Sequence, residues 1–396
     1  MCRNILVSIW YLVFSIKLYK IQDTRYQIQD TKMRILFTGG GSGGHLFPII
    51  AVARQLKKIS PESELFYLGP DDFGIELLIK EGIKVRHILA GKFRRYFSLW
   101  TILDILKIPF GLCQALWFVY FWMPDIIFSK GGYGSAPVVL VSWLYHILIL
   151  IHESDTIPGL ANRLAAKLAK RIAVSFVATE KYFSLKKTAL IGNPIRLEIT
   201  QGSREEGRRI FGINSEKPVI LIIGGSQGSQ AINEIILAIL PQLLEKYEII
   251  HIKGQTLRRR PCKVVSLGSD LEKSYHLYPF LEENQLKHAY TLADLVISRA
   301  GSGSIFEIAA CAKPSILIPL PNAAGDHQKE NAFEYSKFGG AVVIEQSNLT
   351  PHLFLNEIKR ILDNPALAQK MGEGAKNFSQ LEAGQKVAEE LIELVS

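Results

Sequence analysis

The sequence predicts an α/β fold in which two doubly wound parallel sheets form two similar domains. Short apolar runs alternate with helical patterns from residue 33 onward, as strands and covering helices do in parallel-sheet proteins. The order of strand, glycine-rich loop and helix occurs at residue 34 and again at residue 219, about one domain length later. We therefore predict a first domain over 33–195, a second over 196–378, and a C-terminal helix over 379–396 that packs back on the first.

The first 32 residues differ from the rest of the chain. An apolar run at 5–16 is too short for a comfortable membrane span and lacks a small-residue cleavage site. A seven-residue repeat, starting at Ile21 and Ile28, then ends at Met33, where a strand pattern opens. We interpret residues 1–32 as a leader that is either a short anchor or an artefact of the assigned start, and we favour the second.

Composition narrows the classes of partner. The 46 Lys and Arg exceed the 37 Asp and Glu, giving a formal net charge of +9, so phosphorylated substrates, anionic lipid and nucleic acid all fit by charge. The sequence has no RNP-like segment, zinc finger or polybasic run, so we do not expect nucleic-acid binding. The four cysteines form no CxxC pair, which supports neither a disulfide framework nor a structural zinc site.

The first domain opens with a strand at 34–38 and a loop at 39–44 that holds five glycines in six residues, followed by His45. Glycines let backbone N–H groups approach an anion, which the positive end of the next helix also favours. We expect Pro48 in the first turn of that helix. A neutral imidazole there can accept a proton, so His45 is a candidate base, with a capping or buried histidine as the alternative. The loop also fits the GxGxxG spacing of nicotinamide-dependent enzymes.

Other polar loops follow predicted strands. In the first domain these are the glycine-rich residues 130–137 and the residues 152–155, and in the second domain Asp326, Gln328 and Asn331. Ligands bind at the carboxyl ends of parallel strands, so we expect these loops to meet at a cleft facing the other domain. A solvated loop is the alternative for the last group. No GKS or GKT is present, which argues against a P-loop NTPase.

Two glycine-rich helix starts in the second domain, at 224–229 and 298–304, suit a diphosphate approached from two sides. Glu307 lies near the first turn of the second of these helices, where its carboxylate could accept hydrogen bonds from two ribose hydroxyls. The alternative is a capping box formed by Ser304 and Glu307.

Residues 91–123 hold three of the five tryptophans beside several basic residues. The residues concerned are Trp100, Trp117, Trp122, Lys92, Arg94, Arg95 and Lys107. A membrane-interface surface and a core helix with exposed bases are both consistent with this composition. The apolar stretches at 108–123 and 137–151 are too short to predict transmembrane helices.

Seven spaced motifs, taken in order, resemble those of the MurG family, the peripheral N-acetylglucosaminyltransferases of bacterial peptidoglycan synthesis. They are GGGSGGHLFP, KGGYGSAP, HESD, GNPIR, GGSQGS, RAGSGSIFEIAA and DHQKENA. The resemblance implies a GT-B fold, with two Rossmann-like domains facing across a cleft, the donor nucleotide in the second and the acceptor in the first. It also implies transfer of GlcNAc from UDP-GlcNAc to undecaprenyl-pyrophosphoryl-MurNAc-pentapeptide, with inversion, at the cytoplasmic face of an anionic cell membrane.

The family pattern also assigns residues. Donor-binding positions fall on Ser42, Gly43, Gly44, Arg196, Ser226, Leu281, Ser302, Gly303, Ser304, Ile305, Phe306, Glu307 and Gln328. Leu281 would lie by the uracil, and Tyr133 belongs to the loop that favours a pyrophosphoryl acceptor. Two departures stand out: Ser42 replaces the usual Thr, and HESD replaces HEQN, so a sugar contact by Asp155 is the least secure assignment.

Inverting transfer needs a base for the acceptor hydroxyl and stabilisation of the departing diphosphate. We expect His45 as the base, with Glu153 and Asp155 as the next choices, and Arg196 with the helix ends for the diphosphate. No metal and no cofactor is expected. The alternatives are a related glycosyltransferase with another lipid acceptor such as diacylglycerol, an NAD-dependent oxidoreductase, and a membrane-associated protein that binds UDP-GlcNAc without turnover.

Overall fold

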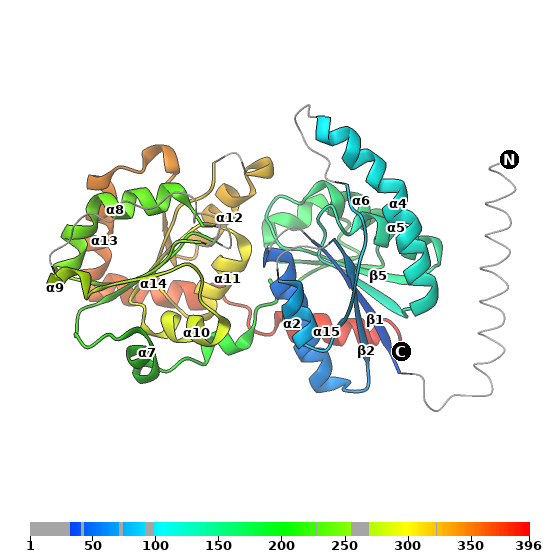
Figure 1. The fold of residues 1–396 in the computed structure, drawn as a ribbon, viewed down its shortest axis with the longest axis horizontal. Helices are drawn as coiled ribbons and strands as arrows, with labels where there is room; N and C mark the ends of the chain where they lie inside the picture. The colour runs from blue at the N-terminus through cyan, green and yellow to red at the C-terminus, as the bar shows by residue number, and fades with distance from the viewer. Residues whose placement is uncertain are drawn as a thin grey trace, which may run out of the picture.

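The computed structural model describes residues 32–40, 43–70, 74–91, 99–225, 228–254, 269–321 and 323–396. These ranges form two α/β domains side by side (Figure 1). Several expectations lie outside the described residues: the leader at 1–31 and the positions Ser42, Lys92, Arg94, Arg95 and Ser226.

A parallel sheet of seven strands in the order β3-β2-β1-β4-β5-β6-β7 forms the centre of the first domain. Its strands are β1 (Arg34–Thr38), β2 (Glu64–Gly69), β3 (Lys84–His87), β4 (Ile126–Ser129), β5 (Leu148–Glu153), β6 (Arg171–Val174) and β7 (Thr188–Leu190). The central strands β1 and β4 are buried on both faces, which is why they appear in the sequence as uninterrupted apolar runs.

Helices cover both faces of this sheet. They are α2 (Gly43–Ile59), α3 (Ile75–Lys80), α4 (Leu99–Trp122), α5 (Ala136–Leu144) and α6 (Leu160–Leu168), with the 3₁₀ helix η1 (Val177–Tyr182) near β7. Alternate residues of β1 point to opposite faces: Ile35 and Phe37 pack with α2 and α3, whereas Leu36 packs with α4 and α5. The C-terminal helix α15 (Ala383–Glu393) joins the α2 side through Val387 and Leu391.

The second domain repeats the topology with six parallel strands in the order β10-β9-β8-β11-β12-β13. Its strands are β8 (Val219–Ile223), β9 (Glu248–Ile252), β10 (Tyr275–Tyr278), β11 (Leu295–Ser298), β12 (Ser315–Leu317) and β13 (Ala341–Val343). In each sheet the first three strands are added toward one edge and the following strands toward the other edge, starting beside the first strand. This is the Rossmann strand order. The predicted fold class is therefore confirmed.

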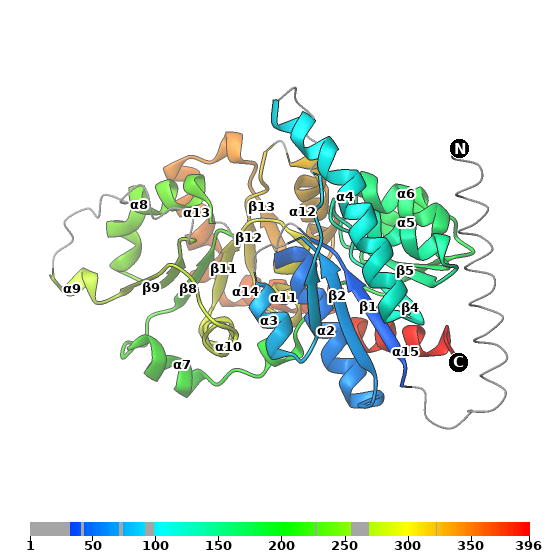
Figure 2. The same ribbon diagram turned by 45° about the vertical axis from the view of Figure 1, so that its right-hand side comes forward.

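The remaining elements surround this second sheet. The helices are α7 (Arg204–Phe211), α8 (Gln230–Leu244), α9 (Ser269–Glu272), α10 (Glu283–Leu292), α11 (Ser302–Ala310), α12 (His327–Ser336), α13 (Pro351–Leu362) and α14 (Pro365–Phe378), and the short 3₁₀ turns are η2 (Leu197–Thr200), η4 (Ala324–Asp326) and η5 (Gln346–Asn348). Helix α11 contacts α2 of the first domain, and the two lie side by side in both views (Figures 1 and 2).

One local prediction was wrong. Pro48 was expected in the first turn of its helix, but α2 begins at Gly43, so the proline lies inside the helix. Because Gly43, Gly44 and His45 are already helical, the glycine loop is shorter than its composition suggested. Proline has no N–H, so the Gly44 carbonyl loses its usual partner four residues on.

Within the described ranges, no helix is both long and apolar enough to cross a bilayer.

Candidate active site

The glycine loop after β1 packs against the loop after β4. A methyl group added at Gly132 would lie 3.4 Å from His45 Cε1 and 2.7 Å from the Gly40 carbonyl oxygen. Gly131 and Gly132 have φ of 80° and 83°, in the left-handed region that favours glycine. The KGGYGSAP loop therefore lies directly against His45, as the sequence predicted for loops at the carboxyl ends of neighbouring strands.

Lys130 is at the centre of this group of loops, and the sequence did not single it out as a site residue. Its side chain is only 2% exposed, and its Nζ donates to Asn193 Oδ1 at 3.3 Å and to Ser154 Oγ. It also lies 2.6 Å from His152 Nδ1, while His152 Nε2 donates to the Gly192 carbonyl at 2.8 Å. One buried amine thus joins three motifs, KGGYGSAP, HESD and GNPIR.

Burial determines the charge states in this cluster. It lowers the pKa of Lys130 to about 7 and lowers the pKa of His152 well below its usual value. His152 is therefore a neutral imidazole that accepts at Nδ1 and donates at Nε2. This arrangement holds the imidazole in one tautomer.

Glu153 maintains the loop that follows β5. Its Oε1 accepts from the Asp155 backbone N–H at 3.0 Å, and its Oε2 accepts from the Gly159 N–H at 3.1 Å and from Asn162 Nδ2 at 2.9 Å. Burial, with the nearby Asp155 charge, raises the pKa of Glu153 to about 7. Since both oxygens are used by the loop itself, this geometry favours a positioning role over that of a base.

Asp155 meets the second domain. Its Oδ1 accepts from Asn331 Nδ2 at 2.7 Å, and Asn331 Oδ1 accepts from Thr156 N at 2.8 Å and Thr156 Oγ1 at 2.9 Å. Asn331 is fully buried in α12, so the solvated-loop alternative is wrong for this residue. Gln328, on the same helix, accepts from the Leu320 N–H through Oε1 at 3.0 Å.

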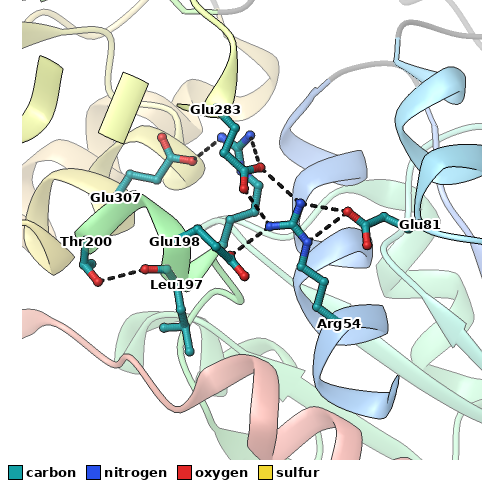
Figure 3. A network of polar contacts seen from close by, with 8 residues as sticks. Arg54, Glu81, Leu197, Glu198, Thr200, Glu283 and Glu307 are labelled. Atoms are coloured by element: carbon teal, nitrogen blue, oxygen red, sulfur yellow. Dashed lines mark hydrogen bonds and ion pairs between the residues drawn. The ribbon is translucent and has the colours of Figure 1, made fainter. Parts of the chain in front are cut away.

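Glu307, labelled in Figure 3, forms an ion pair with Arg196 inside the second domain. Glu307 Oε1 lies 3.1 Å from Arg196 Nη2, and Glu307 Oε2 accepts from the Tyr290 hydroxyl at 3.3 Å. The capping-box alternative is wrong, because α11 begins at Ser302 after the N-cap Gly301 and Ser304 is already helical. The Glu307 side chain is therefore not tied to its own helix end.

Arg196 is held on every side. Its Nη1 lies 3.2 Å from Glu283 Oε2, and its guanidinium carbon lies 3.9 Å from the Phe47 ring centroid of α2. Among the described residues, its Nε has no hydrogen-bond partner although the atom is buried. The expected diphosphate residue thus has one buried N–H that no described residue accepts.

The other expected donor residues lie at the start of α11 and in the core. Ser302, Ile305 and Phe306 are buried, and Phe306 packs against Phe176 and Phe378 at 5.4 and 4.9 Å between ring centroids. Leu281 belongs to the same core. The apolar side chains of Ile305, Phe306 and Leu281 therefore belong to the core, while Gly303 and Ser304 lie in the first turn of α11.

Sequence reasoning missed four residues of this region. Lys130 and Asn193 stand inside recognised motifs, and a lysine directly after a buried strand was an available signal. Arg54 and Glu283 contact each other from different domains, and nothing in their local sequence indicated it. Among the described residues, no group of three His, Cys, Asp or Glu could hold a metal ion.

Comparison with known proteins decides the family. Residues 35–174 match the glycosyltransferase family 28 N-terminal domain, and residues 219–389 match the C-terminal domain of that family. The UDP-N-acetylglucosamine–N-acetylmuramyl-(pentapeptide) pyrophosphoryl-undecaprenol N-acetylglucosamine transferase of Clostridium tetani is 38% identical over 339 residues, covering 84% of this chain and 91% of the relative. Its counterpart in Clostridium botulinum strain Kyoto is 39% identical over 360 residues, covering 88% and 98%.

The chain belongs to the MurG family. The crystal structure of Acinetobacter baumannii MurG agrees, with a TM-score of 0.68 and 26% identity over 92% of this chain and 100% of that one. A UDP-GlcNAc 2-epimerase from Neisseria meningitidis, at 13% identity and a TM-score of 0.64, shares the fold. The resemblance that the seven motifs suggested is confirmed, and the oxidoreductase and diacylglycerol alternatives are not favoured.

Proposed function

We propose that this protein transfers GlcNAc from UDP-GlcNAc to undecaprenyl-pyrophosphoryl-MurNAc-pentapeptide. The observation that carries this proposal is the identity of 34–39% with curated enzymes named for that reaction, over 84–90% of the chain. Residues of four shared motifs also contact one another across the two domains, since Phe47 lies against Arg196 and Asp155 pairs with Asn331.

The donor belongs to the second domain. The N–H groups at the start of α11 suit the diphosphate of UDP-GlcNAc, as does the Arg196 Nε, for which the described part of the chain offers no acceptor. Glu307 is aligned by Arg196 and Tyr290, which leaves its carboxylate oxygens further lone pairs for the two ribose hydroxyls. Leu281 would lie by the uracil, and Gln328 and Asp155 by the sugar.

The acceptor belongs to the first domain. The KGGYGSAP loop, with Tyr133, offers backbone N–H groups to the acceptor pyrophosphate and lies against His45. His45 then takes the proton from the attacking hydroxyl as its oxygen bonds to the anomeric carbon, and the bond to UDP breaks with its electron pair going to the diphosphate. This single displacement inverts the anomeric configuration.

The outer face of α4 and α5 suits a lipid surface. Phe110, Trp117, Phe121, Leu140 and Trp143 are exposed large apolar side chains, and Trp117 is 63% exposed. Trp122 differs, since it packs on Phe66 at 4.8 Å between ring centroids and belongs to the core side of α4. We propose peripheral binding of this face to the cytoplasmic surface of the cell membrane, where the lipid-linked acceptor lies.

The test is a UDP-release assay with purified residues 33–396, UDP-GlcNAc and a short-chain lipid I analogue. Stoichiometric UDP release with formation of the disaccharide lipid supports the proposal. UDP release with diacylglycerol but not with the lipid I analogue would instead indicate a glycosyltransferase with another lipid acceptor. Binding of UDP-GlcNAc without turnover would indicate a protein that binds the nucleotide sugar without catalysis.

A further inference from the structure

Arg54 connects the two domains through carboxylates (Figure 3). It stands on α2, where its Nε and Nη2 donate to Glu81 Oε1 at 2.9 and 2.7 Å within the first domain. Its Nη1 lies 2.8 Å from Glu198 Oε2 and 2.7 Å from Glu283 Oε1, which belong to η2 and α10. The guanidinium is thus fixed in one domain and pairs with two carboxylates beyond it.

Glu283 pairs with Arg54 and also with Arg196, the residue proposed to contact the donor diphosphate. Its Oε1 accepts from Arg54, while its Oε2 lies 3.2 Å from Arg196 Nη1. The other terminal nitrogen of Arg196 pairs with Glu307. A continuous chain of ion pairs therefore runs from Arg54 through Glu283 and Arg196 to Glu307.

Arg54 supplies half of the positive charge in this network. Four carboxylates, those of Glu81, Glu198, Glu283 and Glu307, share two guanidinium groups. Arg196 is only 6% exposed, so charges around it are weakly screened by water. Without Arg54, Arg196 would be the one guanidinium left to the set, drawn toward Glu283 and away from any phosphate.

We infer that Arg54 is a positioning residue for the donor nucleotide, acting across the domain boundary. By neutralising Glu283 it leaves Arg196 placed between Glu307 and the diphosphate position, and it keeps negative charge away from that position. This inference rests on the proposed function, because Arg196 and Glu307 are taken as donor contacts there. Arg54 itself touches neither substrate nor reacting atom.

Arg54→Gln tests the inference by isothermal titration with UDP alone and by steady-state kinetics. We expect UDP affinity to fall about tenfold, which corresponds to about 1.4 kcal/mol, with a matching rise in KM for UDP-GlcNAc and little change in kcat. The matched control is Arg171→Gln, which removes an arginine paired with Glu390 at 3.0 Å between β6 and α15, remote from the network. The control should bind UDP like the wild type.

A second variant separates positioning from a general loss of structure. If Glu283 is the link, Glu283→Gln should restore part of the UDP affinity in the Arg54→Gln background, because the carboxylate that draws Arg196 away from the diphosphate position is gone. Arg54→Lys, which keeps the charge but loses the fork, should be intermediate and serves if Arg54→Gln does not fold.

UDP affinity within twofold of the wild type in both Arg54 variants would overturn the inference. Tighter UDP binding by these variants would also overturn it, and would indicate that the network restrains the two domains. The two proposals fail separately. If UDP binding is weakened in Arg54→Gln but the wild type does not transfer GlcNAc to the lipid I analogue, only the proposed function fails. If the wild type transfers GlcNAc but the Arg54 variants keep the wild-type UDP affinity, only the role of Arg54 fails.

Discussion

Asn331 of the second domain donates a 2.7 Å hydrogen bond to the Asp155 carboxylate of the first, and accepts two hydrogen bonds from Thr156. The HEQN pattern to which the resemblance compares this motif has Asn at the position of Asp155, and here the acid faces an amide that donates to it. The departure from the family pattern thus has a structural partner within the same chain.

Replacing Asn331 with Asp should place two carboxylates in contact in a buried setting. We expect Asn331→Asp to lower the unfolding free energy by about 1–3 kcal/mol at neutral pH, the range for a buried group left unsatisfied, and more if both stay charged. Chemical denaturation measures this. The exchange Asp155→Asn with Asn331→Asp should recover most of the loss, since the pair is restored in reverse; no recovery would show that the two residues are not coupled.

Glu307→Gln should weaken UDP binding by about 1.5–3 kcal/mol, the range for hydrogen bonds to charged groups. The substitution keeps the shape of the side chain but removes the charge that Arg196 aligns. Titration calorimetry with UDP measures the change. Tyr290→Phe, which removes the other partner of Glu307, is the control and should change affinity far less; a lower melting temperature with unchanged affinity for Glu307→Gln would make the residue purely structural.

His45→Ala should lower turnover by about 100- to 10,000-fold, the usual loss for a general base. Because the glycine loop beside His45 is also expected to contact the donor, UDP-GlcNAc affinity must be measured separately and should change little. His352→Ala, at an exposed position of α13, is the control. Turnover within a few-fold of wild type at saturating substrates would remove His45 as the base and direct the search to Glu153 and Asp155.

Lys130→Met should change how stability depends on pH. Because burial lowers the pKa of Lys130 from 10.5 to about 7, the unfolded chain binds more protons than the native protein between these values. The contribution of Lys130 to stability, measured as the difference between the wild type and Lys130→Met, is therefore most favourable above the upper pKa. It declines as the pH falls toward 7, by up to about 1.4 kcal/mol per pH unit. Urea unfolding at several pH values gives the difference, and parallel curves for the two proteins would contradict it.

Trp117→Ser with Phe121→Ser should reduce co-sedimentation with anionic liposomes while UDP binding stays intact. Both side chains are exposed on α4 with ring centroids 4.5 Å apart, so their removal takes apolar area from one patch. Leu353→Ser, an exposed apolar side chain of α13, is the matched control. If the folded double variant co-sediments as much as the wild type, this face of α4 does not bind the membrane.

The sequence predicted the sheets well because buried parallel strands are continuous apolar runs that end at glycine. Val219 to Ile223 and the glycines after it show both features, and β8 occupies those residues. The start of α2 was misplaced because Gly43 and Gly44 were treated as loop residues, whereas packing of Leu46 and Ile49 on β1 accompanies a helix that already includes both glycines.

Residues of the candidate site could be predicted from the sequence only where they belong to a recognisable motif. His45, Glu307 and Asp155 were found because each stands in a glycine-rich or strand-end motif. Arg54 and Glu283 are separated by more than 200 residues, and their pairing at 2.7 Å depends on how the two domains meet. Neither the hydrophobic periodicity nor the local structural propensity of the sequence predicts a contact between residues of two different domains.

The position of α15 has a consequence for biosynthesis. Val387 and Leu391 fill the side of the first domain that α2 leaves open, although the chain must complete the second domain before reaching them. A ribosome releases these residues last, so the domain translated first acquires its full core only after translation ends. Until then its unfinished apolar surface is exposed in the cell, and a nascent chain arrested before residue 383 should be a preferred client of chaperones.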